Sequence, residues 1–475
     1  MSPELASPAA LWEAVNQTFA PFAGTCLYAV RAETFFHLAQ ASADPLRFHL
    51  RNLVYRWVLA ARRGRSRGER PHGEYLFVCD YAAEPGFGSL RPLLVSCDAP
   101  AAIVINASVQ AARGKELTAP GVLVIPADVA GQRQQWRSRS RDDYELLQAA
   151  APRLMRGLLL ASRRVVRALL QRAYGYEALY REIFASGGWR ALITHNDFTS
   201  LSYLAGEAAR QHDVPDFTLQ HGFPSLEYFP TSASHYLVWG AAFEKWMRGR
   251  GEDSTTRIAV TGAPRLASLP SCAAAGRGAA RARMMRLGLA RAGRLNVLFL
   301  SQSHSPVFSS EQHRQILTLV SALSAEPWLH LMVRPHPQES RAKRRSWPGA
   351  SVVPAEISLL EAVLAADIVL SVNSTAMLEA ALLRTPVLQI ALPGLECSFG
   401  VLRFPRQAQD LDQARAELGK LCDQNEREEC IAAQQKLVEA CVNPVAGGTD
   451  LVWSYIRAVC EETSGTKPAL AQEAR

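Results

Sequence analysis

The hydrophobic positions of this 475-residue chain are concentrated in short, continuous apolar runs, with helix-like segments between many of them. A run of roughly four to eight apolar residues is typical of a strand buried on both faces, and alternation with helices indicates a parallel sheet. Helices are predicted near 141–173 and over 200–211. The first series of predicted strands comprises 74–80, 101–106, 121–126, 191–197, 217–222, 235–240 and 257–262.

The same pattern starts again in the second half of the chain. The predicted strands are 296–303, 329–335, 350–354, 367–372 and 386–390, and the predicted helices are 310–324, 357–365 and 374–383. The remainder, to about residue 460, is predicted to be helical. Two such series predict an α/β protein with two Rossmann-like domains that face each other across a cleft.

A chain of this length is too long for one ordinary core, and its composition indicates where it divides. Residues 268–294 are rich in Ala, Gly and Arg, and we interpret them as a linker that includes one helix. The flanking N-terminal and C-terminal domains are predicted at 73–267 and 295–445. The outer parts are a helical, basic N-terminal extension at 1–72, a C-terminal helix at 446–460 and a tail at 461–475 whose composition predicts disorder.

The chain carries 52 Lys and Arg against 44 Asp and Glu, so its formal net charge is +8. That balance suits nucleic acid, an anionic membrane or an anionic sugar as a partner. Nucleic acid is not expected, because aromatic residues are not interleaved through the basic clusters as in a nucleic-acid groove. Seven arginines lie at 51–70, where an amphipathic helix would contact an anionic membrane. A solvated helix followed by a flexible loop explains the same run.

The nine cysteines are scattered and form no CxxC pair, which argues against a zinc site or a disulfide framework and predicts free thiols in a reducing compartment. The first residues carry acids and prolines, so no signal peptide is expected. No apolar run reaches the roughly 18–20 residues that span a bilayer. We therefore expect a cytoplasmic protein, with peripheral contact at the inner face of the plasma membrane through 51–70.

Polar clusters follow two strands of the second series, and the carboxyl ends of parallel strands are where open α/β sheets bind ligands. The cluster 334–337 holds Arg334 and His336, with a proline on each side of the histidine. A fixed imidazole there would bond a phosphate oxygen and help a phosphate-linked group depart. The cluster 373–375 opens a predicted helix, where hydroxyls and unpaired N–H groups favour an anion. The predicted donor site therefore consists of Arg334, His336, Asn373, Ser374, Thr375, Glu379 and Ser301.

These assignments have structural alternatives. His336 would then be a turn histidine, Arg334 a member of a domain-interface ion pair, and one of the two hydroxyls a simple helix cap. Glu379 would face solvent near a helix start instead of binding a ribose hydroxyl. Three successive polar residues at 373–375 are more than capping requires.

A second group of polar residues follows strands of the first series. His221 lies between Gln220 and Gly222, and the glycine permits a ligand to approach closely. His221 is the predicted general base, because an imidazole titrates near the working pH and can take a proton from an acceptor hydroxyl. Asp197 is a competing candidate. The predicted acceptor-binding residues are Gly86 and Gly88, in a glycine-rich stretch that would cradle the acceptor or make a turn, with His195, Gln220 and Arg265.

Together these residues resemble a GT-B glycosyltransferase. More narrowly, they resemble the superfamily of CDP-glycerol glycerophosphotransferases, bacterial polysialyltransferases and capsular Kdo transferases. The resemblance rests on an HP motif at 336–337, a Ser/Thr motif at 374–375, an HG(x)P element at 221–224 and a G(x)PR element at 262–265, within roughly 190–390. It implies that His336, Ser374 and Thr375 bind the nucleotide phosphate and that His221 is the base. The sequence has Asn373 where a serine is expected, and it lacks a clear acidic acceptor motif of the polysialyltransferases.

The function expected from these observations is an inverting transferase of capsule or other cell-envelope polysaccharide. It would move a sugar or a polyol phosphate from a CMP- or CDP-linked donor to a surface polysaccharide or lipid-linked glycan. His221, Asp197 and His336 are the catalytic candidates. No acidic DxD-type pair ends a strand, so we expect metal-independent catalysis without a cofactor. The alternatives are an isomerase or hydrolase like the UDP-GlcNAc 2-epimerases, and a non-catalytic GT-B scaffold in polysaccharide assembly.

Overall fold

The computed structural model describes residues 8–43, 72–82, 84–117, 121–127, 135–223, 228–250, 255–302, 310–336, 347, 349–392 and 403–465. Four features of the sequence lie outside these residues: the arginine cluster at 51–70, Pro224 and Pro337 of the two motifs, and the tail from 466 onward. No helix within the described ranges is long and apolar enough to cross a membrane.

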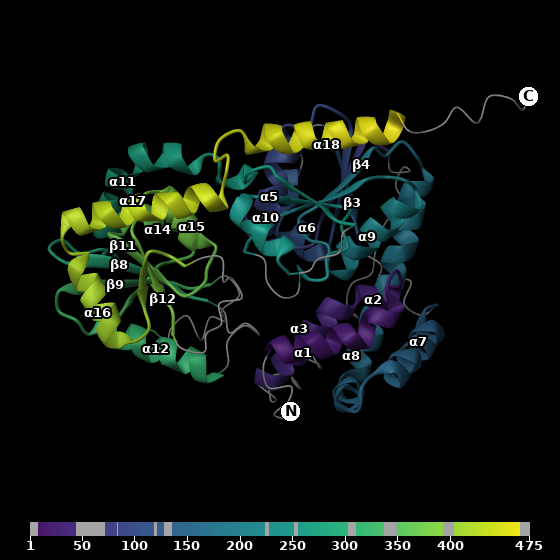
Figure 1. Ribbon diagram of the computed structural model, residues 1–475, viewed down its shortest axis with the longest axis horizontal. Coiled ribbons are helices and arrows are strands. Elements are labelled where there is room, and N and C mark those ends of the chain that lie inside the picture. Colours follow the sequence, from purple (N-terminus) through teal and green to yellow (C-terminus); the bar gives the residue numbers. More distant parts are fainter. Residues whose placement is uncertain are drawn as a thin grey trace, which may run out of the picture.

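Two parallel sheets confirm the predicted α/β class, and Figure 1 shows them in separate halves of the molecule. The first sheet has the order β3-β2-β1-β4-β5-β6-β7, and the second has the order β10-β9-β8-β11-β12-β13. The first contains β1 (Tyr75–Cys79), β2 (Ala101–Ile105), β3 (Val122–Pro126), β4 (Ala191–Thr194), β5 (Asp216–Leu219), β6 (His235–Val238) and β7 (Arg257–Val260). The second contains β8 (Leu295–Leu300), β9 (Leu329–Arg334), β10 (Ser351–Val352), β11 (Ile368–Ser371), β12 (Val387–Ile390) and β13 (Arg406–Ala408).

The central strands of both sheets are buried on both faces, which explains why they are continuous apolar runs, whereas the outer strands β3 and β7 are partly exposed. In β1, Leu76 and Val78 belong to one core cluster while Tyr75 and Phe77 belong to another on the opposite face. The helices of the N-terminal half are α1 (Pro8–Phe19), η2 (Ala20–Phe22), α2 (Cys26–Ala29), α3 (Arg31–Ala43), α5 (Glu84–Val95), α6 (Ala107–Arg113), η3 (Gly114–Leu117), α7 (Arg137–Ala150), α8 (Arg153–Ala185), α9 (Ser200–Gln211), α10 (Ala241–Arg248) and η6 (Pro264–Leu266).

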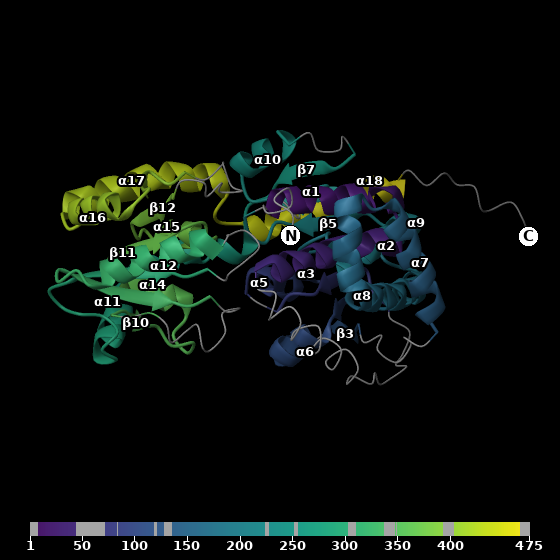
Figure 2. The ribbon, with the colours of Figure 1, turned by 90° about the horizontal axis from the view of Figure 1, so that it is seen from below.

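The N-terminal helices form a layer beside the first sheet. Elements α1, α2 and α3 pack on α8, and α8 packs on α9. Figures 1 and 2 both place these helices in the N-terminal half, with α7 at its outer edge and α1 and α3 nearer the second half. Glu33 of α3 accepts hydrogen bonds from the backbone N–H of Ser200, at 3.1 Å, and from its hydroxyl, at 2.5 Å. The N-terminal extension is therefore tied to the first turn of α9.

The C-terminal half contains α11 (Leu269–Arg286), α12 (Ser310–Ser324), α14 (Leu359–Ala365), α15 (Ala376–Leu382), α16 (Leu411–Lys420) and α17 (Gln424–Cys441). Helix α11, in the predicted linker, packs on α14. After α17 the chain crosses back to the first sheet, where α18 (Gly448–Gly465) covers one face and the Trp453 ring lies 4.9 Å from that of Tyr75. Gly240 allows this crossing, because a Cβ there would lie 2.5 Å from the carbonyl carbon of Cys441.

Several elements differ from the sequence prediction. The long helical stretch near 141–173 is two helices, α7 and α8, and α18 runs to Gly465, inside the predicted tail. The three-residue strand β13 lies where only helices were expected, at an edge of the second sheet and paired with β12. The glycine-rich stretch after β1, expected as a loop or turn, begins α5 at Glu84. In the last two cases tertiary contacts override a weak local signal, since β13 is short and polar while α5 contains Pro92 as well as Gly86 and Gly88.

Each sheet reverses its strand order once, and this reversal positions the candidate site. In the first sheet β1 and β4 are neighbours, and the chain proceeds outward from them in both directions. In the second sheet β8 and β11 have the same relationship. Such a switch point opens a crevice at the carboxyl ends of the strands. Most of the predicted site residues follow β4, β5, β8, β9 or β11.

Candidate functional site

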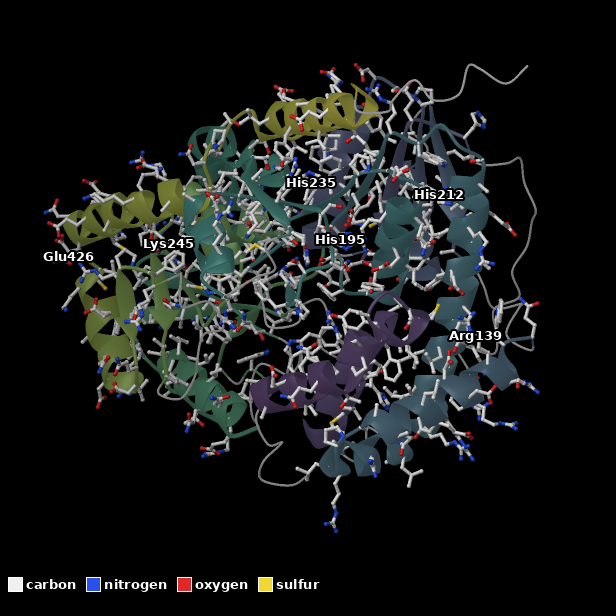
Figure 3. All side chains as sticks on the ribbon, turned by 45° about the vertical axis from the view of Figure 1, so that its right-hand side comes forward. Arg139, His195, His212, His235, Lys245 and Glu426 are labelled. Carbon is white, nitrogen blue, oxygen red and sulfur yellow. The ribbon has the colours of Figure 1, made fainter. Side chains whose placement is uncertain are left out.

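A buried polar network occupies the switch point of the first sheet. Asp80 follows β1, and its Oδ1 lies 3.1 Å from His195 Nε2 and 2.8 Å from Asn196 Nδ2, both just after β4. The Thr199 hydroxyl donates to the other carboxylate oxygen. Burial raises the pKa of Asp80, but the hydrogen bonds from His195, Thr199 and Asn196 outweigh it and hold the pKa at about 2. The ionised Asp80 carboxylate thus fixes the orientation of the His195 ring. Figure 3 shows this histidine near the centre of the molecule.

His221 is held in one tautomer by its two neighbours. Its Nδ1 lies 2.6 Å from the carbonyl oxygen of His195, which can only accept, so Nδ1 carries the proton. Its Nε2 lies 2.9 Å from the hydroxyl of Tyr228, which donates to the remaining lone pair. Burial, together with repulsion from His195, lowers the pKa of His221 to about 3. The imidazole is therefore neutral, with Nε2 oriented toward a hydroxyl group, but its pKa is far below the near-neutral value expected from the sequence.

Gln220 and Asp197 hold the surrounding backbone in place. The side chain of Gln220 donates to the Gly222 carbonyl at 2.9 Å and accepts from the Trp239 N–H at 2.9 Å, which fixes the turn that carries His221. Asp197 Oδ2 accepts from the backbone N–H groups of Ser232, at 2.5 Å, and of Ala233, at 3.1 Å. Burial raises the pKa of Asp197, and these backbone bonds oppose the rise. The carboxylate of Asp197 thus already has donors from its own domain.

The predicted acceptor glycines lie in helix α5 and not in a loop. A Cβ at Gly86 would lie 3.0 Å from the ring of His195 and 3.0 Å from the carbonyl oxygen of Tyr81. The glycine therefore permits α5 to pack directly on the histidine. Gly88 lies two residues further along the same helix.

Two of the contacts between the histidine-bearing domain and the second domain involve predicted site residues or their neighbours. The backbone N–H of Phe223 donates to Thr375 Oγ1 at 3.2 Å. Arg265 pairs with Glu379 at 3.0 Å, and the two side chains are only 7% and 17% exposed. Glu379, which was predicted to bind a ribose hydroxyl, is thus paired with Arg265, which was predicted to bind the acceptor substrate. The Nε and Nη2 atoms of Arg265 are buried and have no hydrogen-bond partner within the described residues.

The donor candidates follow three adjacent strands of the second sheet. Strand β8 lies between β9 and β11, so Ser301, the segment around His336 and the cluster 373–375 end at the same edge. The Ser301 N–H donates to the Arg334 carbonyl at 3.0 Å, which joins two of these ends. Burial lowers the pKa of His336.

Other donor candidates already bond to protein groups. The guanidinium of Arg334 donates to the carbonyl oxygens of Pro354, at 2.7 Å, and Ile357. Ser374 Oγ accepts at 3.2 Å from the N–H of Ala376, the first residue of α15, while Asn373 is half-buried just before it. Helix α15 has only seven residues, so hydroxyl groups are a better basis than a helix dipole for anion binding here.

A small cavity of about 10 Å³ lies beside Ser301 and has room for a single water molecule. Its lining includes Gln302 and Trp347, whose Oε1 and Nε1 atoms are buried without a hydrogen-bond partner in the described ranges. Unpaired polar atoms at the end of β8 indicate a place where a ligand's polar groups would be accepted.

Sequence reasoning did not identify Tyr228, although it contacts the basic nitrogen of His221. Tyr228 follows no strand and belongs to no recognised motif, so no signal indicated it. The pairing of Arg265 with Glu379 was also not foreseen, because it depends on how the two domains dock. Within the described residues, no group of three or more His, Cys, Asp or Glu side chains is arranged to hold a metal ion.

No protein-family model matches the chain, and no curated protein matches its sequence. Solved structures do resemble it. The S. aureus MnaA–UDP co-structure aligns with a TM-score of 0.52 at 11% identity, over 82% of this chain and 97% of that chain. A glycosyltransferase from Rickettsia africae aligns with a TM-score of 0.50 at 10% identity, over 83% of this chain and all of that one, 100%.

A variant of the wall teichoic acid polymerase TagF aligns with a TM-score of 0.46 at 11% identity, over 82% of this chain and 90% of that chain. This last alignment is too loose to support an inference. The first two show that the chain has the GT-B fold, with a helical N-terminal segment added to it. Because the sequence identities are only 11% and 10%, these two alignments show the fold and nothing about activity.

Proposed function

We propose that this chain is an inverting, metal-independent glycosyltransferase or polyol-phosphate transferase. Its donor would be a nucleotide-activated group, CMP- or CDP-linked, and its acceptor a hydroxyl of a surface polysaccharide or lipid-linked glycan. The observation that carries this proposal is the hydrogen bond from Phe223 to Thr375. It joins the His221 turn of one domain to the Ser/Thr cluster of the other, which supports the proposal that a base and a phosphate site adjoin across the domain boundary.

The proposed reaction begins at Nε2 of His221. This nitrogen takes the proton from the acceptor hydroxyl, in place of the hydrogen bond that it now receives from Tyr228. The acceptor oxygen then bonds to the transferred group while the bond from that group to the nucleotide phosphate breaks. His336, Ser374, Thr375 and the free N–H groups of Arg265 would stabilise the negative charge on the departing phosphate.

Of the two base candidates, His221 and Asp197, the hydrogen bonds support His221. The carboxylate of Asp197 already accepts two backbone N–H groups, at 2.5 and 3.1 Å, and removing them would leave the loop at Ser232 without its anchor. His221 has a lone pair bonded only to a side-chain hydroxyl that can rotate away. His336 remains the proposed acid or hydrogen-bond donor at the phosphate.

The test is a transfer assay with purified protein, CMP-, CDP-, UDP- and GDP-activated donors and a glycan acceptor, with products identified by mass spectrometry and their configuration determined by NMR spectroscopy. We expect transfer from a cytidine donor with inverted configuration, and a loss of about 10²–10⁴-fold in turnover for His221→Ala with donor affinity unchanged. Free UDP and an epimerised sugar from UDP-GlcNAc without acceptor would contradict the proposal. So would indifference to every nucleotide, which is the behaviour of a scaffold. We place the reaction in capsule or cell-envelope synthesis, at the cytoplasmic face of the plasma membrane.

A further inference from the structure

A strongly basic cavity lies between α7 and α8, in a part of the molecule that the proposed reaction does not use. It has a volume of about 890 Å³, and its lining contains five guanidinium groups and no carboxylate. The lining residues are Arg137, Arg141, Arg163, Arg164, Arg167, Ala168 and Gln171. Figure 1 shows α7 at the outer edge of the N-terminal half, and Figure 3 shows Arg139 of the same helix far from Glu426 of the other domain.

The spacing of the arginines explains how they gather. Arg137 and Arg141 are four residues apart on α7, and Arg163 and Arg167 are four residues apart on α8, so each pair lies on one face of its helix. Two hydrogen bonds hold these helices together beside the cavity. Arg167 Nη2 donates to the Arg137 carbonyl at 3.1 Å, and Gln171 donates to Ser140 at 3.0 Å.

The charges in this cavity are not neutralised by ion pairs within the described part of the chain. Arg163 lies over the ring of Tyr144, with 5.7 Å between Cζ and the ring centre, and the buried Nε of Arg167 has no partner there. Burial lowers the pKa of Arg167, repulsion from Arg163 and Arg141 lowers it further, and attraction to Glu145 and Asp142 opposes them. Arg139, outside the cavity, is by contrast paired with Glu177 at 3.0 Å.

We propose that this cavity is a binding site for a ligand that carries two or more phosphate groups. Guanidinium groups bind phosphate oxygens in pairs of parallel hydrogen bonds, and several groups that converge without a counter-charge favour a multiply charged anion. The volume exceeds what one phosphate fills. Two sources share this chemistry, namely the phosphorylated headgroups of membrane lipids and a soluble polyphosphate. Leu160, 63% exposed and one turn before Arg163 and Arg164, gives a lipid an apolar contact beside the site.

The test compares the variant Arg141→Gln/Arg163→Gln/Arg164→Gln with the control Arg286→Gln/Arg291→Gln/Arg294→Gln. Each removes three positive charges from exposed arginines, but the control residues lie at the end of α11 and after it. One arm measures cosedimentation of the full-length protein with phosphatidylcholine vesicles, with and without cardiolipin, whose headgroup carries two phosphate groups. The other measures titration calorimetry with inorganic pyrophosphate at fixed ionic strength.

We expect binding to weaken about a hundredfold in the cavity variant and only slightly in the control, because each basic residue near an anionic surface contributes roughly fivefold. Loss in the vesicle arm identifies lipid-borne phosphate, and loss in the pyrophosphate arm alone identifies a soluble ligand. Equal binding by variant and control in both arms, or no binding by the wild type, overturns the proposal. Circular dichroism confirms that both variants fold. The site shares no residue with the transferase site, so these outcomes do not depend on the proposed activity.

Discussion

The ion pair between Arg265 and Glu379 offers a quantitative test of how the two domains dock. The perturbations are Arg265→Met, Glu379→Leu and the double variant. The guanidinium and the carboxylate lie 3.0 Å apart with 7% and 17% of their side chains exposed. Charge centres about 4 Å apart attract by about 4 kcal/mol at an effective dielectric constant of about 20. That attraction offsets the cost of taking both charges out of water.

Removing one partner of such a pair leaves the other buried without compensation, so each single variant should lose about 3 kcal/mol of stability. The double variant should lose much less, because apolar replacement of a whole buried pair is often nearly neutral. The coupling free energy is the two single losses minus the loss of the double variant, so it should exceed about 3 kcal/mol and approach about 6 kcal/mol if the double variant is neutral. Turnover should not recover in the double variant, since the buried N–H groups of Arg265 are absent from it.

The assay is urea denaturation of the wild type, both single variants and the double variant, followed by tryptophan fluorescence. The exposed pair between Arg314 and Glu311, 67% and 56% exposed, is the control. The equivalent cycle there should give a far smaller coupling, because water and salt screen exposed charges. Additive effects at Arg265 and Glu379, with a coupling as small as the control, would refute the docking of the two domains described here.

Three further predictions concern the site. Because the pKa of His221 is about 3 when folded and 6.5 when unfolded, only the unfolded state gains a proton as the pH falls through 6.5. Between pH 7.5 and 5 the free energy of unfolding of the wild type should therefore fall by roughly 2 kcal/mol more than that of His221→Asn. Equal falls for the two proteins in thermal scans would contradict the lowered pKa of His221. Gly86→Ala should destabilise by about 1–3 kcal/mol because its Cβ would press on His195, whereas Gly157→Ala, with nothing within 4 Å, should be neutral or stabilising. Thr375→Val should weaken nucleotide binding about tenfold in calorimetry, and unchanged affinity would remove this hydroxyl from the donor site.

The apolar runs predicted most of the fold because most strands of both sheets are buried on both faces. Each of the twelve predicted strands corresponds to a strand of the structure, from β1 to β12. Strand β13 was missed because Arg406 and Gln407 are polar and the strand has only three residues. The start of α5 was missed because Gly86 and Gly88 are poor helix formers, and packing against His195 outweighs that preference.

The candidate site was partly predictable for a topological reason. The carboxyl ends of neighbouring parallel strands meet at one edge, so polar residues that follow strands, such as His195 and His221, were expected to lie together. In the structure, Nδ1 of His221 lies 2.6 Å from the carbonyl oxygen of His195. The contact of Tyr228 with His221 was not predictable, because it depends on a connection without regular structure. The arginine cavity was not predictable either, since the pairing of α7 with α8 is not encoded in the spacing within either helix.

The proposed function requires that His336 and Thr375 bind the same nucleotide phosphate, opposite His221. The most direct measurement is a crystal structure of the protein with bound CDP. Our account predicts phosphate oxygens about 2.7–3.2 Å from the imidazole of His336 and from the hydroxyl of Thr375, on the side that faces His221. A nucleotide whose phosphates contact neither residue would contradict it.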